Sequence, residues 1–128
     1  MHKRHSTGFT LIEILIAVAI LGIIGAIAVP SYGSYIKQAR RLDAQVALRG
    51  EAQQMERCRT EQFTYVGCSP STDQESPDRY YMISFGTPTA NTYTLTATPV
   101  SGKTQANDTD CPSFTIDQTG ATSPADCW

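Results

Sequence analysis

A continuous apolar run near the N-terminus limits what this chain can become more than any other feature. From Phe9 to Val29 every residue is apolar except Thr10 and Glu13. A helix of about 20 residues spans a hydrocarbon core about 30 Å thick, so the run is long enough to cross a membrane. A charged residue inside such a segment costs on the order of 2.5–3.5 kcal/mol at mid-bilayer and less near an interface. The run therefore predicts a membrane segment in which Glu13 requires an explanation.

The four cysteines all follow the apolar run, and they fall into two local pairs. The first pair is Cys58 and Cys68, and the second is Cys111 and Cys127. An even number of cysteines beyond an export signal favours disulfides in an oxidising compartment. Zinc is the alternative, but the chain has no C-x-x-C knuckle. We expect the disulfides Cys58–Cys68 and Cys111–Cys127, rather than a metal site or free thiols.

The distribution of histidine argues against enzyme chemistry. Both histidines, His2 and His5, precede the apolar run. An exported domain would therefore lack the histidine of Ser–His–Asp and Cys–His nucleophiles, and it would lack histidine metal ligands. No glycine-rich phosphate loop is present. We expect a protein that is not an enzyme and that needs no cofactor.

The basic and small residues around the run leave two ordinary interpretations open. In a cleaved secretory signal, "MHKRH" is the basic region and "AIA" at Ala26–Ala28 offers a cleavage site, although Glu13 lies early in the apolar region. In a plain single-pass anchor, basic residues before the run favour a cytoplasmic N-terminus, but basic residues also follow it, so the charge rule is ambiguous. These residues are Lys3 and Arg4 before the run and Lys37, Arg40 and Arg41 after it.

A third interpretation comes from the residues at the start of the run. A short basic leader ends in Gly8, and Phe9, Thr10, Leu11, Ile12 and Glu13 follow. This order resembles the type IV prepilin signature, in which glycine, an aromatic residue and an acid fall at fixed offsets. The resemblance implies that a prepilin peptidase cuts between Gly8 and Phe9, that Phe9 is N-methylated and that the apolar helix is retained. Gly22 and Pro30 also match the pattern, which implies a role in filament packing.

The implied cleavage gives Glu13 a physical role. It leaves a cationic amine on Phe9, which becomes buried when subunits pack. A bare charge in a low dielectric is very costly, and a paired charge is much less so. Glu13 would therefore neutralise the amine of its own chain or of a neighbouring subunit. Such a pair would penalise wrong axial registers between helices.

Helical signals continue beyond the apolar run. They predict one long helix from Phe9 to roughly Arg57, with an amphipathic second half that packs on a sheet. Pro30 lacks an N–H and is expected to kink or locally open this helix, unless it simply marks the exit from the membrane. The apolar stripe consists of Tyr32, Tyr35, Ile36, Ala39, Leu42 and Val46, with Ala52 and Met55 later, and Arg40, Arg41, Asp43, Arg49 and Glu51 are expected on other faces.

Three strand-like runs follow an exposed loop, residues 68–79, that is rich in Ser, Pro and Asp. They are Tyr80–Phe85, Thr92–Pro99 and Ser113–Gln118. With the helix covering one face, they predict an α+β fold in which a long N-terminal helix packs on a three- or four-stranded antiparallel sheet.

The order of these segments resembles pilins over the whole chain, most closely PilE-type minor pilins. The resemblance rests on the "TYTLTATP" strand, the "FTIDQTG" strand and the terminal "CW", and it implies the ladle-shaped pilin fold. In pilins the loop bounded by the C-terminal cysteines is exposed and contributes to subunit contacts or adhesion. The same role is implied for the loop from Cys111 to Cys127, whose closure contributes roughly 3 kcal/mol.

Two binding functions are not expected. The segment Asn107–Asp110 offers oxygen atoms of the kind that calcium prefers, but too few of them, so we expect a solvated acidic turn and no metal. DNA binding requires a patch of Lys and Arg. From Glu56 onward the chain has four basic and nine acidic residues, a net charge of −5. Direct DNA binding is therefore not expected unless those few basic residues cluster tightly.

We interpret the chain as a type IV pilus subunit, a minor pilin that serves twitching motility, adhesion or DNA uptake. Its expected parts are a leader (1–8), a transmembrane and assembly half of the helix (9–29), an amphipathic half (30–57) and a periplasmic sheet domain (58–128). It would cross the inner membrane once and then enter the extracellular pilus. Its partners would be other pilins, the prepilin peptidase and the inner-membrane assembly platform. The alternatives are a type II secretion pseudopilin and a periplasmic binding domain released after Ala28.

Overall fold

The structure is a computed structural model that describes residues 8–128, so His2, Lys3, Arg4 and His5 of the leader lie outside the described residues. The chain divides into two compact units, one ending at Tyr35 and the other Ile36–Trp128, and each is described by itself. The elements are α1 (Leu11–Gln62), β1 (Gln74–Glu75), β2 (Tyr81–Ser84), β3 (Thr94–Pro99), η1 (Thr104–Asn107), β4 (Phe114–Asp117), β5 (Thr122–Ser123) and η2 (Ala125–Cys127).

Helix α1 contains 52 residues and runs without interruption through Pro30. It ends at Gln62, five residues beyond the expected end. The stop comes from Phe63, whose φ of 58° is left-handed and whose N–H donates to the carbonyl of Arg59 at 2.7 Å. A left-handed residue after the last turn is a common way to end a helix, although glycine usually occupies it. No local sequence pattern predicts an aromatic residue with a left-handed backbone at the end of this helix.

The sheet is antiparallel throughout, with the order β1-β2-β3-β4-β5. The three predicted strand runs contain β2, β3 and β4, and the predicted α+β fold is confirmed. The sheet has five strands rather than three or four because β1 and β5 add two residues at each edge. Such short strands carry no alternation pattern from which they could be predicted.

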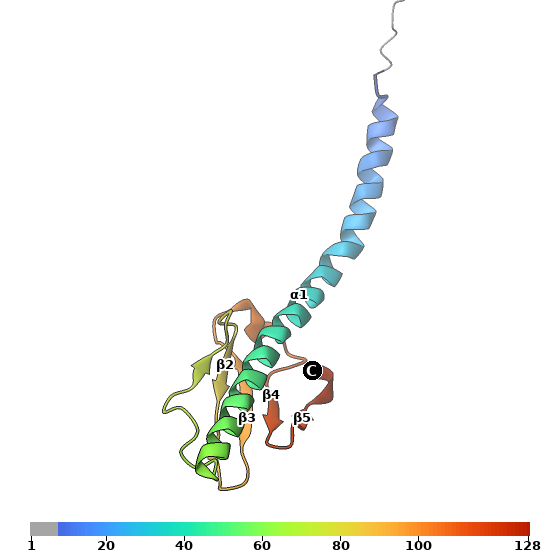
Figure 1. The fold of residues 1–128 in the computed structure, drawn as a ribbon. Coiled ribbons are helices and arrows are strands. Elements are labelled where there is room, and N and C mark those ends of the chain that lie inside the picture. The colour runs from blue at the N-terminus through green and yellow to red at the C-terminus, as the bar shows by residue number, and fades with distance from the viewer. Residues whose placement is uncertain (1–7) are drawn as a thin grey trace, which may run out of the picture. The chain divides into compact units, whose positions relative to one another are not determined.

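The core of Ile36–Trp128 lies between α1 and one face of the sheet, where α1 crosses the strands (Figure 1). Residues alternate between buried and partly buried along β2 and β4, as expected for a sheet with one covered face. The fully buried apolar residues are Ala44, Leu48 and Met55 from α1 and Tyr81, Ile83, Leu95, Ala97 and Phe114 from the strands.

The face of α1 that packs on the sheet is not the predicted apolar stripe, and this expectation was wrong. Leu42 and Val46 are 58% and 63% exposed, whereas Arg41 and Asp43, expected on other faces, are buried. Only the later members of the stripe, Ala52 and Met55, pack toward the core. Periodicity failed here because the sheet side supplies polar partners that allow charged residues to be buried.

Candidate functional site

The start of α1 is closed by a reciprocal pair of hydrogen bonds between Thr10 and Glu13. The N–H of Thr10 donates to Glu13 Oε2 at 2.8 Å, and the N–H of Glu13 donates to Thr10 Oγ1 at 3.3 Å. The Thr10 hydroxyl donates to the same carboxylate at 3.0 Å. This is a capping box, in which residues three apart satisfy N–H groups that lack helical partners. Glu13 therefore has a local structural role as well as the charge-pairing role expected from the sequence.

The apolar half of α1 presents its side chains outward. By length and composition α1 can cross a membrane, and none of its most apolar window is buried within the chain. Phe9, the residue after the predicted cut, is 87% exposed. Gly22 has no neighbour that an added Cβ would meet. Without subunits or lipid around it, this segment would expose a large apolar surface to water.

Pro30 lies within α1 and lacks the N–H that would bond to the carbonyl of Ala26. In the same unit, Tyr32 and Tyr35 are both exposed. Of the predicted site residues, Gly8 and Phe9 precede α1, and Glu13, Gly22 and Pro30 lie within it. They do not converge on a pocket.

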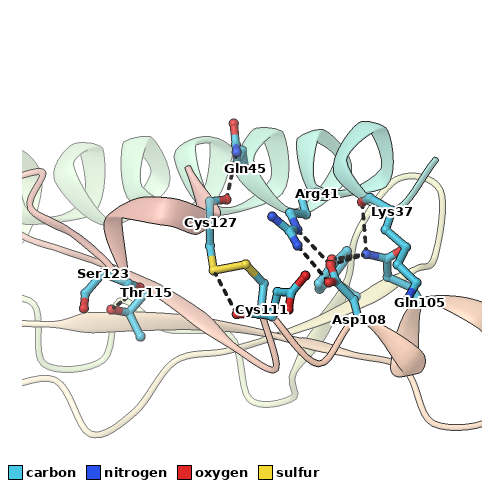
Figure 2. The surroundings of a disulfide bond; sticks show 11 residues. Lys37, Arg41, Gln45, Gln105, Asp108, Cys111, Thr115, Ser123 and Cys127 are labelled. Atoms are coloured by element: carbon cyan, nitrogen blue, oxygen red, sulfur yellow. Dashed lines mark hydrogen bonds and ion pairs between the residues drawn. A yellow bond between two sulfur atoms is a disulfide. The ribbon is translucent and has the colours of Figure 1, made fainter. Parts of the chain in front are cut away.

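A buried polar cluster in Ile36–Trp128 was not predicted (Figure 2). Arg41 makes two hydrogen bonds to the carboxylate of Asp108, at 2.7 and 2.8 Å. Gln105 Nε2 lies 3.0 Å from the same carboxylate and 2.7 Å from the Tyr81 hydroxyl. The Asp108 carboxylate raises the pKa of Arg41, chiefly by accepting these hydrogen bonds. The cluster ties α1 to η1 and β2.

The same cluster corrects the expectation of a solvated turn at Asn107–Asp110. Asp108 is only 1% exposed, whereas its neighbours Asn107, Thr109 and Asp110 are exposed. An isolated buried carboxylate would be costly, and Arg41 provides the compensating charge. Neither residue carries a local signal of this pairing, because 67 positions separate them.

Asp43 forms a second link from α1 to the loop before β2. Its carboxylate accepts a hydrogen bond from the Ser76 hydroxyl and others from the N–H groups of Asp78, at 3.0 Å, and Tyr80, at 3.4 Å. The loop expected at residues 68–79 is therefore fixed at its C-terminal end by a buried acid.

Two disulfides bound loops at different places in the domain. Cys58 is bonded to Cys68 and Cys111 to Cys127, the two pairs expected from the spacing. Cys111 and Cys127 are buried, and the carbonyl of Cys127 accepts a hydrogen bond from Gln45 of α1 at 3.1 Å (Figure 2). Within residues 8–128, no three His, Cys, Asp or Glu side chains lie close enough together to hold a metal ion.

The loop closed by Cys58 and Cys68 carries an unexpected apolar tip. Phe63 is 85% exposed, and Val66 is also exposed. Behind them, the hydroxyls of Tyr65 and Tyr93 both donate to the carboxylate of Glu56, at 2.9 and 3.1 Å. The tip is thus held on a hydrogen-bonded base that includes the end of α1.

Comparison with protein families divides the chain at Pro30. Residues 30–115 match the family described as type IV minor pilin ComP, DNA uptake sequence receptor. Residues 3–29 match the prokaryotic N-terminal methylation motif.

The individual proteins to which the chain is similar are fimbrial proteins, a type IV pilin and a type II secretion protein. The chain is 38% identical over 74 residues to the type II secretion system core protein G of Pseudomonas aeruginosa, covering 58% of this chain and 49% of that protein. It is 46% identical over 44 residues to the fimbrial protein EcpC of Eikenella corrodens, covering 34% and 29%. The chain thus spans about half, or less, of the length of these curated relatives. A solved structure of a type IV pilin from Shewanella oneidensis is 36% identical, with a TM-score of 0.56, and the match covers 72% of this chain and 97% of that one.

Proposed function

Because the chain belongs to the family of type IV minor pilins described as ComP, we propose that it is a structural subunit that enters a type IV pilus through its N-terminal helix. The observation that carries the proposal is the start of α1, where an exposed apolar helix begins with Glu13 five positions after Gly8. Before assembly, the subunit is anchored in the inner membrane, with residues 58–128 in the periplasm. Its work is assembly with other pilins on the membrane platform, and it has no catalytic role.

Processing changes the charge at the start of α1. Cleavage between Gly8 and Phe9 by the prepilin peptidase creates an amine on Phe9, one residue before Thr10. In the uncut chain the Glu13 carboxylate accepts hydrogen bonds from Thr10. After cleavage the same carboxylate is within a few residues of a cation, and it can neutralise that cation or the one on a neighbouring subunit. Gly22 and Pro30 would let the helix adapt to its neighbours.

Two substitutions at Glu13 separate helix capping from charge pairing. A glutamine at this position of a capping box keeps the reciprocal hydrogen bonds but carries no charge, whereas an alanine loses both. We expect Glu13→Gln and Glu13→Ala to insert into the membrane as the wild type does and to be equally poor at entering filaments. Incorporation can be measured by immunoblotting sheared pili against the membrane fraction. If Glu13→Gln entered filaments normally, the charge-pairing role would be wrong.

The mature N-terminus decides between the proposal and release by signal peptidase. Mass spectrometry of the mature chain should find a methylated Phe9. A chain that began at Val29 would instead identify a released periplasmic domain. The pseudopilin alternative, which the similarity to a type II secretion protein keeps open, would be supported if deletion abolished secretion but left pili intact.

DNA reception is a second candidate function, favoured by the description of the matching family. This candidate function differs from the expectation, made from the sequence, that the chain does not bind DNA directly. That expectation rested on a net charge of −5 from Glu56 onward. That count omitted Lys37, Arg40, Arg41 and Arg49, which belong to the same folded unit. A filter-binding assay on the purified chain decides the matter, because a DNA receptor should have a salt-sensitive, micromolar or better affinity. A lack of binding would leave assembly as the proposed function.

A further inference from the structure

Three basic residues gather around η1 in Ile36–Trp128. We call Lys37, Arg40, Tyr80 and Lys103 the η1 cluster. Lys37 Nζ donates to the carbonyl of Asn107 at 2.8 Å, and Arg40 donates to the Thr104 hydroxyl, so the two residues contact opposite ends of η1. The guanidinium of Arg40 lies 4.5 Å from the centre of the Tyr80 ring, and Lys103 Nζ lies 5.9 Å from it. Residues far apart in the sequence therefore form one compact positive patch.

The nearest buried acids do not neutralise this patch. Asp108 is paired with Arg41, and Asp43 accepts hydrogen bonds from Ser76 and from two N–H groups. The folded unit as a whole has eight Lys and Arg residues against eleven Asp and Glu, a net charge of −3. The η1 cluster is thus a local excess of positive charge on a negative domain, so a negatively charged surface would attract the domain by this side.

The cations of the cluster keep donors for a ligand. An ammonium has three N–H donors, and Lys37 and Lys103 each use one on a backbone carbonyl. The Tyr80 ring holds the Arg40 guanidinium by a cation–π contact, which occupies none of its N–H groups. Phosphate oxygens are suitable acceptors for the remaining donors.

Chain connectivity limits how far Lys37 can lie from the membrane segment. Lys37 follows Val29 by eight residues of the same helix, α1. At 1.5 Å per residue this is about 12 Å along the helix, whatever the orientation of the rest of the domain. The headgroup layer extends roughly 5–8 Å beyond each side of the hydrocarbon core. A lysine side chain at this position can reach that layer.

We propose that the η1 cluster binds the anionic headgroups of phospholipids while the subunit is anchored in the membrane. The inference rests on the anchored state and goes beyond the proposed role in assembly. Tethering makes the contact intramolecular, with an effective concentration in the millimolar range, so weak individual contacts suffice. A duplex would need several more cations, since DNA-binding proteins commonly neutralise about 6–10 phosphates. Three cations on a negative domain fit a few headgroups better than a DNA tract.

Hydrogen–deuterium exchange of the full chain in lipid nanodiscs tests the proposal. The comparison is between phosphatidylcholine discs and discs in which about one lipid in three is phosphatidylglycerol. We expect slower amide exchange over residues 101–108 in the anionic discs, and loss of this protection at high salt. Each basic residue near an anionic surface contributes roughly a five-fold factor, so Lys37→Gln/Lys103→Gln should reduce the protection by about 25-fold.

Two controls separate lipid binding from general effects of charge or folding. Arg49→Gln/Arg57→Gln removes the same charge from exposed positions outside the cluster and should keep the protection. Lys37→Arg/Lys103→Arg should keep it too, which guards against misfolding of the glutamine variant. Equal exchange in both kinds of disc would overturn the proposal. Protection by added duplex DNA, without any response to phosphatidylglycerol, would also overturn it and assign the cluster to a nucleic acid. Co-elution of every variant with the discs shows separately that anchoring is intact.

Discussion

Single charged residues in this chain are placed where each has a specific partner. The Glu13 carboxylate accepts hydrogen bonds from Thr10 in the uncut chain, and in the proposed mature chain it faces the amine of Phe9. Arg41 and Asp108 follow the same rule in the folded domain, where their close contact compensates for burial. Removing one member of such a pair costs more than the pair itself contributes, because the remaining charge is left buried.

The first prediction concerns Arg41. Replacing it with alanine leaves the Asp108 carboxylate buried and without its cation, and we expect the free energy of unfolding to fall by about 3 kcal/mol. Denaturant unfolding of the full chain in detergent, followed by circular dichroism, would measure the change. Arg57→Ala, the same change at an exposed position of α1, should stay within about 0.5 kcal/mol of the wild type. Equal stability of the two variants would show that Asp108 finds another partner or water.

At the scale of elements, α1 presents two apolar faces in the folded domain with different neighbours. Ala44, Leu48 and Met55 pack against the sheet and are fully buried. Leu42 and Val46 point away from the sheet and remain exposed. Since the chain belongs to a family of filament subunits, the outer face is available to other pilins, whereas the inner face is committed to folding.

The second prediction follows from these two faces. Leu48→Ala should destabilise the domain by about 3 kcal/mol, because it opens a cavity in the core. Leu42→Ala should change stability by less than about 0.5 kcal/mol but reduce the fraction of subunits recovered in sheared pili. Thermal unfolding and the pilus assay together check both statements. If Leu42→Ala assembled normally, the outer face would not be a contact.

The third prediction concerns the disulfide Cys111–Cys127. Replacing both cysteines with serine removes a cross-link between residues 16 positions apart and should lower the free energy of unfolding by about 3 kcal/mol. A hydrogen bond from Gln45 of α1 to the carbonyl of Cys127 holds the same segment in place. Because loss of the disulfide would loosen this segment first, hydrogen exchange should rise most over residues 119–128. A uniform rise across the domain would contradict a local role for this disulfide.

The sequence predicted those elements that have a strong periodic pattern or a covalent marker. The long apolar helix and the strands around Ile83, Leu95 and Ile116 follow from pattern alone, and the cysteine spacing suggested the two disulfides. The edge strands β1 and β5 could not be predicted, because two residues show no alternation. The pairing of Arg41 with Asp108 was also out of reach, since a buried ion pair between distant segments depends on tertiary structure.

The candidate site also divides into residues that the sequence can identify and residues that only the fold brings together. The offsets of Gly8, Phe9 and Glu13 can be read from the sequence, and the spacing of Thr10 and Glu13 is also that of a capping box. The η1 cluster could not be found in this way. Its four residues come from three distant segments, and only the fold brings Arg40 and Lys103 to the same tyrosine ring.

At the scale of the whole molecule, two buried tyrosines make the stability of the folded domain depend on pH in the alkaline range. Burial raises the pKa of Tyr81 on β2 and of Tyr93, next to β3, above the ordinary value of 10.0. Hydrogen bonding of Tyr93 to the carboxylate of Glu56 raises its pKa further. Both groups therefore stay neutral in the folded chain at a pH at which they would ionise in the unfolded chain.

The fourth prediction is that the domain loses stability as the pH rises above about 10. Below the unfolded pKa both states carry a neutral tyrosine, so the stabilisation is fully present. Above it the unfolded state ionises first, and each further unit of pH costs up to about 1.4 kcal/mol for each tyrosine until the folded pKa is reached. Thermal unfolding between about pH 8 and pH 11.5 would show a falling midpoint.

Tyr93→Phe should lower stability by about 1 kcal/mol at neutral pH through the lost hydrogen bond and should give a shallower decline above pH 10. An unchanged slope in that variant would mean that Tyr93 ionises with equal ease in the folded and unfolded chains.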